Sequence, residues 1–211
     1  MPPSPPTIAV VDYGYGNLRS VAKALERCAL SVRVTGDPRE LAGADGVVLP
    51  GVGAFKDAAE NLAKRGLDEA VVRAIEAGKP YLGLCLGLQL LFEEGHEHGV
   101  TRGFGLLPGR VERFPETDPR LCVPHIGWNE VVFSGDHPMR AALPERDHYY
   151  FVHSYRAVPA EASDVVGRTD YGGTFASAVA REGIFAVQFH PEKSQSAGHR
   201  LLEAYAAWVA R

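Results

Sequence analysis

The sequence predicts an α/β protein of three layers, in which a mainly parallel central sheet is flanked by helices and extended by antiparallel strands in the C-terminal half. Up to about residue 105, strand-like and helix-like segments alternate, the βαβα pattern of a parallel sheet. After that point, short alternating segments follow one another, which is typical of added antiparallel strands. The chain has 211 residues, enough for one substantial core.

The elements of the first half follow in a regular order. Short apolar runs predict strands at 8–13, 31–36, 46–51 and 81–85. Helices are expected between and after them, at 17–28, 37–44, 54–66, 67–78 and 86–94. Asn17 is a suitable cap for the first of these helices, and Asp37-Pro38 is a favourable start for the second.

The second half is expected to consist of strands closed by one helix. The strand-like segments lie at 110–114, 128–133, 148–155, 164–170, 175–180 and 184–190. Residues 197–211 have the apolar spacing of an amphipathic helix. We expect one domain over residues 7–211, preceded by a proline-rich tail over residues 1–6.

Composition narrows the class of protein. The net charge is −4 and the pI about 6.1, so the chain shows no electrostatic footprint for nucleic acid. Its apolar stretches are broken by glycine or charge, and its first residues lack the basic and apolar parts of a signal peptide. Three cysteines without paired spacing suit a reducing cytosol, so a cytoplasmic location is expected. His96 and His98 are interpreted as surface residues, and we expect neither a metal nor a cofactor.

A cysteine between two glycines stands where an expected strand meets an expected helix. Residues 83–87 read Gly-Leu-Cys-Leu-Gly, a nucleophile elbow with a thiol in place of a hydroxyl. The sharp turn needs small neighbours and puts Cys85 at a helix N-terminus, where amide groups and the helix dipole favour a thiolate. The pattern predicts a nucleophile, although the motif alone also fits a small buried cysteine in a glycine-flanked loop.

A second candidate group follows the last expected strand. Residues 184–189 run into His190-Pro191-Glu192, and Pro191 donates no N–H, which is typical of a strand end or edge. In an extended segment residues i and i+2 face the same way, about 6.6 Å apart, so Glu192 is within reach to orient the His190 imidazole. Alone, this pattern also fits a polar strand exit. With Cys85 it supplies the nucleophile, base and orienting group of a triad.

A glycine-rich turn supplies the third feature. The strand at 46–51 continues into Val52 and Gly53, so the segment reads Pro-Gly-Val-Gly. Its glycines permit unusual backbone angles and close approach of a ligand. An amide of this loop, at Val52, together with the amide of Leu86, is suited to bind a tetrahedral oxyanion. Taken alone, the segment also fits a plain strand-to-helix turn.

These three motifs resemble those of the class-I, or triad, glutamine amidotransferases, which have a flavodoxin-like fold. The chain order of Cys, His and Glu differs from the Ser, Asp, His order of α/β-hydrolases. Further segments resemble the glutaminase subunits of imidazole glycerol phosphate synthases; they lie at residues 11–20, 123–131 and 148–155. This resemblance runs from about Thr7 to the C-terminal helix.

The resemblance implies an activity and the residues that perform it. Glutamine would be hydrolysed to glutamate and ammonia by Cys85, His190 and Glu192, and the ammonia would serve the formation of imidazole glycerol phosphate and AICAR in histidine biosynthesis. Gln89 lies at i+4 from Cys85, on the same helix face. Substrate binding is implied for Gly51, Gly53, Gln89, Glu97, Ser154 and Tyr155.

The resemblance also implies a protein partner. Because the chain is too short to contain a synthase domain, a separate (β/α)₈-barrel cyclase subunit would receive the ammonia in a heterodimer. The implied docking face consists of Asn17, Pro124, His125, Trp128, Tyr150 and Lys193. Aromatic anchors are enriched at interfaces, but Trp128 and Tyr150 fit core aromatics almost equally well.

Two alternatives remain at this point. The chain could be another glutaminase, such as a pyridoxal phosphate synthase subunit or a detached anthranilate synthase subunit, but the segments at 12–17 and 124–129 argue against both. It could also be a non-catalytic flavodoxin-like binding or redox-sensor module that carries a reactive Cys85. Such a module has no need of His190 and Glu192 at their spacing.

Overall fold

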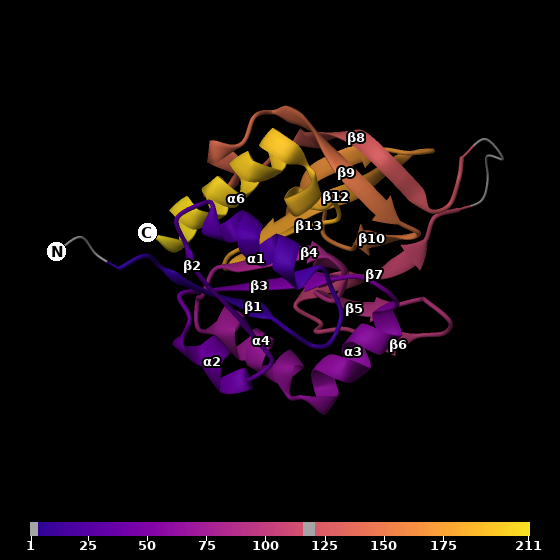
Figure 1. Ribbon diagram of the computed structural model, residues 1–211. Coiled ribbons are helices and arrows are strands. Elements are labelled where there is room, and N and C mark those ends of the chain that lie inside the picture. The colour runs from indigo at the N-terminus through magenta and orange to yellow at the C-terminus, as the bar shows by residue number, and fades with distance from the viewer. Residues whose placement is uncertain (1–3, 116–120) are drawn as a thin grey trace.

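The computed structural model describes residues 4–115 and 121–211 (Figure 1). The tail expected over residues 1–6 therefore lies partly outside the described residues, and the limits of the domain stay a prediction. The centre of the sheet is parallel and has the strand order β2-β1-β3-β4-β13. These strands are β1 Thr7–Val11, β2 Ser31–Thr35, β3 Gly46–Gly51, β4 Tyr81–Cys85 and β13 Ile184–Val187.

Helices cover both faces of this parallel centre, which confirms the predicted layers (Figure 1). The two faces follow the alternation of side chains along β1: Ile8 and Val10 pack towards α1 and α6, whereas Ala9 and Val11 pack towards α2, α3 and α4. The helices are α1 Leu18–Glu26, α2 Pro38–Gly43, α3 Phe55–Lys64, α4 Leu67–Glu76 and α6 Gln195–Val209.

The C-terminal half extends the sheet with antiparallel strands, as the alternating segments predicted. β12 pairs with β13 and with β10, and β10 continues to β7. A branch leads from β12 through β11 and β8 to β9. The strands are β7 Leu107–Arg113, β8 His125–Phe133, β9 Arg146–His153, β10 Tyr155–Pro159, β11 Val165–Asp170 and β12 Thr174–Arg181; short 3-10 helices lie at Arg140–Ala142, Ala162–Asp164 and Pro191–Lys193.

The helix expected at residues 86–94 is much shorter in the structure. It ends after one turn as α5, Leu86–Gln89, and Phe92–Gly95 forms β5 instead. β5 pairs in parallel with β7 and antiparallel with β6, Thr101–Arg102. Because residues 86–92 are all buried, the segment has no polar face, and hydrophobicity alone does not distinguish a buried strand from a buried helix. Cys85 therefore precedes the amides of a single turn rather than a long helix dipole.

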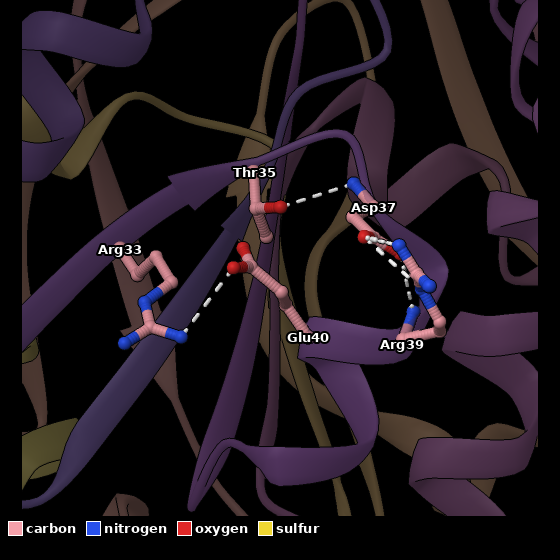
Figure 2. Close-up of polar contacts among 5 residues, drawn as sticks. All are labelled: Arg33, Thr35, Asp37, Arg39 and Glu40. Atoms are coloured by element: carbon pink, nitrogen blue, oxygen red, sulfur yellow. Dashed lines mark hydrogen bonds and ion pairs between the residues drawn. The ribbon is translucent and has the colours of Figure 1, made fainter.

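The start of α2 shows how the sequence fixes a helix end (Figure 2). Asp37 is the N-cap, and its carboxylate accepts the Arg39 main-chain N–H at 2.9 Å. The Asp37 N–H donates to Thr35 Oγ1 at 3.0 Å. Hydrogen bonds from Arg39 lower the pKa of Asp37 to about 2. The expected start at Asp37 is thus confirmed, whereas Asn17 stands at the N-cap of α1 without a side-chain capping bond.

Replacement of the α2 cap tests this local assignment. We expect Asp37→Ala to lower the Tm at pH 7 by about 2–4 °C, because α2 loses an acceptor for its first turn. The pKa of Asp37 is depressed, so the carboxylate stabilises the fold above its ordinary pKa of 3.8, and the effect is lost as the pH falls through about 2. Asp37→Asn keeps an acceptor and serves as the control in calorimetry. Equal Tm values for the parent and Asp37→Ala would contradict the assignment.

Candidate active site

The backbone at Cys85 makes the sharp turn that the sequence predicted. Cys85 ends β4 with φ 53° and ψ −101°, a conformation that residues with a side chain rarely adopt. A Cβ at Gly83 would lie 2.6 Å from the Gly87 carbonyl oxygen, and a Cβ at Gly87 would overlap the Leu49 carbonyl oxygen on β3. Both glycines are therefore required by close backbone packing, and this packing holds Cys85 at the end of its strand.

His190 lies close to Cys85 because β13 runs parallel to β4. The register pairs Val187 with Leu84, so both strands end at the same edge of the sheet. His190 Nδ1 lies 2.8 Å from Glu192 Oε1, and both side chains are almost fully buried. The expected extended geometry is wrong, since residues 191–193 form a 3-10 turn. This turn brings the carboxylate to the imidazole while Nε2 of His190 has no hydrogen-bond partner among the described residues.

The site contains one charged histidine and two neutral ones. Burial alone would lower the pKa of His190, but neighbouring Cys85 and Glu192 outweigh it and raise the pKa to about 10. Burial lowers the pKa of His153 to about 3 and that of His125 to about 4. At neutral pH, His190 is therefore an imidazolium, while the other two histidines are neutral.

A cavity of about 450 Å³ opens above Cys85. Most of the predicted substrate residues line it: Gly53, Gln89, Glu97, Ser154 and Tyr155. Glu97 also accepts the Phe55 N–H at the start of α3, at 2.7 Å, which fixes its carboxylate. Gly51 is not among the lining residues: it is buried, and the Tyr13 hydroxyl and Leu86 cover the place where a side chain would project, so its contact with substrate stays a prediction.

The two predicted oxyanion donors lie on either side of Cys85. Leu86 begins α5, so its amide has no intrahelical partner. Val52 and Gly53 follow β3, whose last residue, Gly51, pairs in register with Cys85. Val52 and Leu86 both line the cavity, and Gly53 has φ +95°, which a residue with a side chain rarely adopts.

Four of the predicted docking residues lie at this cavity or are linked to its lining by side-chain contacts: Pro124, Trp128, Tyr150 and Lys193. Pro124 and Lys193 line the cavity itself. The Trp128 and Tyr150 rings meet edge to face at 6.3 Å, and Lys193 Nζ lies 5.8 Å from the Tyr150 ring centroid. Asn17, Trp128 and Lys193 are exposed, and Tyr150 is half-buried. Trp128 is 48 % exposed, so its interpretation as a core aromatic is wrong.

His125 does not belong to this surface. It is 2 % exposed and stacks on Tyr171 with a centroid distance of 3.9 Å. Residues on a strand alternate between faces, so His125 points to the core while Trp128, three residues later, points outward. Ile126, 59 % exposed, shares the outward face with Trp128, and the same alternation would have identified it from the sequence.

Two buried residues of the site were missed by the sequence analysis. Ser194 accepts the Tyr150 N–H at 3.0 Å and donates to the His190 carbonyl at 2.6 Å, which ties β9 to the turn after β13. Gln188 donates to Cys85 Sγ at 3.5 Å and accepts from Gln89 at 3.0 Å. Each looks in the sequence like an ordinary polar residue beside a strand, and only the pairing of distant strands reveals its contacts.

The chain is similar to a protein family, to individual proteins and to solved structures. A protein-family model described as glutamine amidotransferase class-I matches residues 9–206. Imidazole glycerol phosphate synthase subunit HisH of Methylococcus capsulatus is 51 % identical over 210 residues and 96 % of each chain. The protein of that name from Aquifex aeolicus is 51 % identical over 197 residues, covering 93 % of this chain and 94 % of its own.

Among solved structures, the similarity is one of fold. A chain in the structure of PurLQS from Thermotoga maritima has a TM-score of 0.77 at 20 % identity, covering 98 % of this chain and 100 % of that one. The glutaminase domain of Trypanosoma brucei CTPS with bound acivicin has a TM-score of 0.69 at 18 % identity, with coverages of 97 % and 93 %. These values support the α/β architecture that the sequence predicted.

The charge states of the three histidines can be measured directly. In a ¹⁵N NMR titration, we expect the His190 ring to remain protonated until the pH approaches about 10, while His125 and His153 stay neutral down to about pH 4. Glu192→Gln removes one of the two groups that raise the pKa of His190, so this pKa should fall while those of His125 and His153 stay low. A neutral His190 ring at pH 7 in the parent would contradict the ion pair.

Proposed function

Because the chain belongs to the class-I glutamine amidotransferases, and within them to the HisH subunits of imidazole glycerol phosphate synthase, we propose that Cys85, His190 and Glu192 hydrolyse glutamine to glutamate and ammonia in histidine biosynthesis. One observation carries the assignment of residues: a cysteine in a strained turn shares a cavity with a buried His–Glu pair. The chain is an enzyme, and its relatives argue against both the other glutaminases and a non-catalytic redox module.

The proposed reaction begins from a thiolate and an imidazolium. The Cys85 thiolate attacks the carboxamide carbon, and the carbonyl oxygen becomes an oxyanion held by the amides of Leu86 and Val52. The imidazolium of His190 protonates the departing nitrogen, so ammonia leaves and a γ-glutamyl thioester remains. His190, now neutral, takes a proton from water, which attacks the thioester and releases glutamate. Glu192 holds the imidazole through Nδ1 in both halves of the reaction.

Glutamine would lie in the cavity with its carboxamide at Cys85. Gln89, fixed by its own hydrogen bonds, is suited to contact the carboxamide end. Glu97 offers a negative charge to the α-amino group, and the backbone at Ser154 and Tyr155 faces the α-carboxylate. The Ser154 and Tyr155 carbonyls accept hydrogen bonds inside the protein, so their substrate contacts would come mainly from amide groups.

The partner would be the (β/α)₈ cyclase subunit, which uses the ammonia to form imidazole glycerol phosphate and AICAR. Free ammonia would be protonated in water and lost as a nucleophile, so the two sites need a sealed junction. The exposed group of Trp128, Ile126 and Lys193 beside the cavity supports docking there. Tyr150 connects this face to the site, because its main-chain carbonyl accepts the main-chain N–H of His190 at 2.9 Å.

The cellular location is proposed as the cytoplasm. The described helices include none long and apolar enough to cross a membrane. Cys28, Cys85 and Cys122 are all unpaired, which suits a reducing compartment.

Replacement of the nucleophile tests the central assignment. We expect Cys85→Ser to lower glutamine hydrolysis more than about 10³-fold, because the serine hydroxyl is not a nucleophile at neutral pH without the geometry built for it. The complex with the cyclase should still form product from added ammonium salts. Cys122→Ser, at an exposed cysteine, is the matched control and should retain activity. Substantial hydrolysis by pure, folded Cys85→Ser would exclude Cys85 as the nucleophile.

The oxyanion loop generates a second prediction, which concerns coupling to the partner. Gly51 and Gly53 flank Val52, so the loop peptide can turn its N–H away from Cys85 at low steric cost. We expect kcat of the free chain to be at least about 10²-fold below that of the complex with its nucleotide ligand, the effect of one missing oxyanion donor. The complex without ligand is the control, because the ligand must favour the active loop state. Equal kcat values for the free chain and the liganded complex would refute the switch.

A further inference from the structure

A fully buried glutamine contacts the nucleophile and has no role in the reaction described above. Gln188 follows β13, and its main-chain N–H donates to the Ser177 carbonyl on β12 at 2.9 Å. Its side-chain Nε2 donates to Cys85 Sγ at 3.5 Å, and its Oε1 accepts from Gln89 Nε2 at 3.0 Å. Gln188 therefore joins the sulfur to the glutamine that is proposed to contact the substrate.

The direction of this chain of hydrogen bonds is determined at its far end. The Tyr155 carbonyl oxygen can only accept, and it takes one N–H of Gln89 Nε2 at 3.2 Å. The second N–H of Gln89 then faces Gln188, which has to present its oxygen. The amide nitrogen of Gln188 consequently points at Cys85. The main-chain carbonyl of Tyr155 on β10 therefore fixes the orientation in which the N–H group of Gln188, and not its oxygen, faces the Cys85 sulfur.

We propose that Gln188 is a positioning residue of the glutaminase reaction, which stabilises the Cys85 thiolate and holds the Gln89 amide in one orientation. This inference rests on the proposed function of Cys85. A hydrogen bond to a charged acceptor is roughly twice as strong as a neutral one, so the bond from Gln188 favours the thiolate over the thiol. Because Gln188 is 0 % exposed, water does not compete for its amide.

The effect of Gln188 has to be separated from that of the charges around the sulfur. His190 and Glu192 face it from the turn after β13, and Tyr13 faces it from the end of β1. The other titratable groups of the cavity are Glu97, His153, Tyr155 and Lys193. All seven are retained in the variants below, so a change in thiolate reactivity reports the amide chain.

The test is the pH dependence of Cys85 alkylation by iodoacetamide, followed by peptide mass spectrometry in the full chain. Gln188→Met removes both side-chain hydrogen bonds at similar volume. We expect it to move the alkylation midpoint upward by about one pH unit or more and to lower kcat about tenfold with a smaller change in KM. Gln89→Met, which leaves Gln188 free to rotate, should move the midpoint in the same direction although Gln89 does not contact the sulfur.

Ser177→Ala is the matched control. The Ser177 side chain is as deeply buried as Gln188 and accepts from Thr169 Oγ1 at 2.8 Å, while the main-chain carbonyl that binds Gln188 is kept. Its alkylation midpoint should equal that of the parent. If Gln188→Met does not fold, Gln89→Met alone decides the outcome.

Two failures are distinguishable in this experiment. If Cys85 of the parent reacts no faster than Cys28 and Cys122, the proposed function is wrong. If Cys85 reacts selectively but the midpoints of Gln188→Met and Gln89→Met match that of Ser177→Ala, the positioning role is overturned and the function stands.

Discussion

The contact between the elbow and β3 is the constraint on which the site depends. Gly87 touches the Leu49 carbonyl so closely that no side chain fits, and this packing holds Cys85 at positive φ. Such a conformation costs on the order of 1–3 kcal/mol, which the surrounding sheet has to offset. In return, the sulfur, the first amide of α5 and the end of β3 at Gly51 meet at one point. One packing contact therefore positions both the proposed nucleophile and the two candidate oxyanion donors.

The charge state of each buried histidine in the site is set by the groups next to it rather than by how deeply the ring is buried. His190 and His153 are both almost fully buried, and burial opposes the charge of each. His190 is nevertheless charged because Cys85 and Glu192 adjoin it, whereas His153 hydrogen-bonds to His125 and to a main-chain carbonyl. The imidazole of His190 is therefore suited to the proton transfers proposed for it, whereas His125 and His153 belong to a neutral aromatic cluster.

The sequence was sufficient for the fold class, and it indicated the residues of the proposed triad, because the signals for both are local. Apolar runs and glycines mark the strands and the turn at Cys85, and His190 and Glu192 are two residues apart. Predictions from the sequence failed where contacts between distant parts of the chain determine the local structure. The helix after Cys85 was expected to continue, but Phe92 joins a strand whose partner lies elsewhere in the chain. His125 was expected at the surface, although its position on a strand opposite to Trp128 already argued otherwise. Gln188 carries no local signal, since its partner at Cys85 is distant in sequence.

The adjacency of β4 and β13 has a consequence for synthesis on the ribosome. Cys85, the proposed nucleophile, is translated early, whereas Ile184, the first residue of the strand that leads to the proposed base His190, comes 99 residues after Cys85. At about 5–20 residues per second, the nascent chain carries the cysteine for several seconds or more without a base beside it. During that time one edge of the apolar strand β4 has no partner strand, and such an edge can pair with another chain and lead to aggregation. A polypeptide that terminates before β13 therefore lacks both His190 and Glu192 and leaves this edge of β4 unpaired.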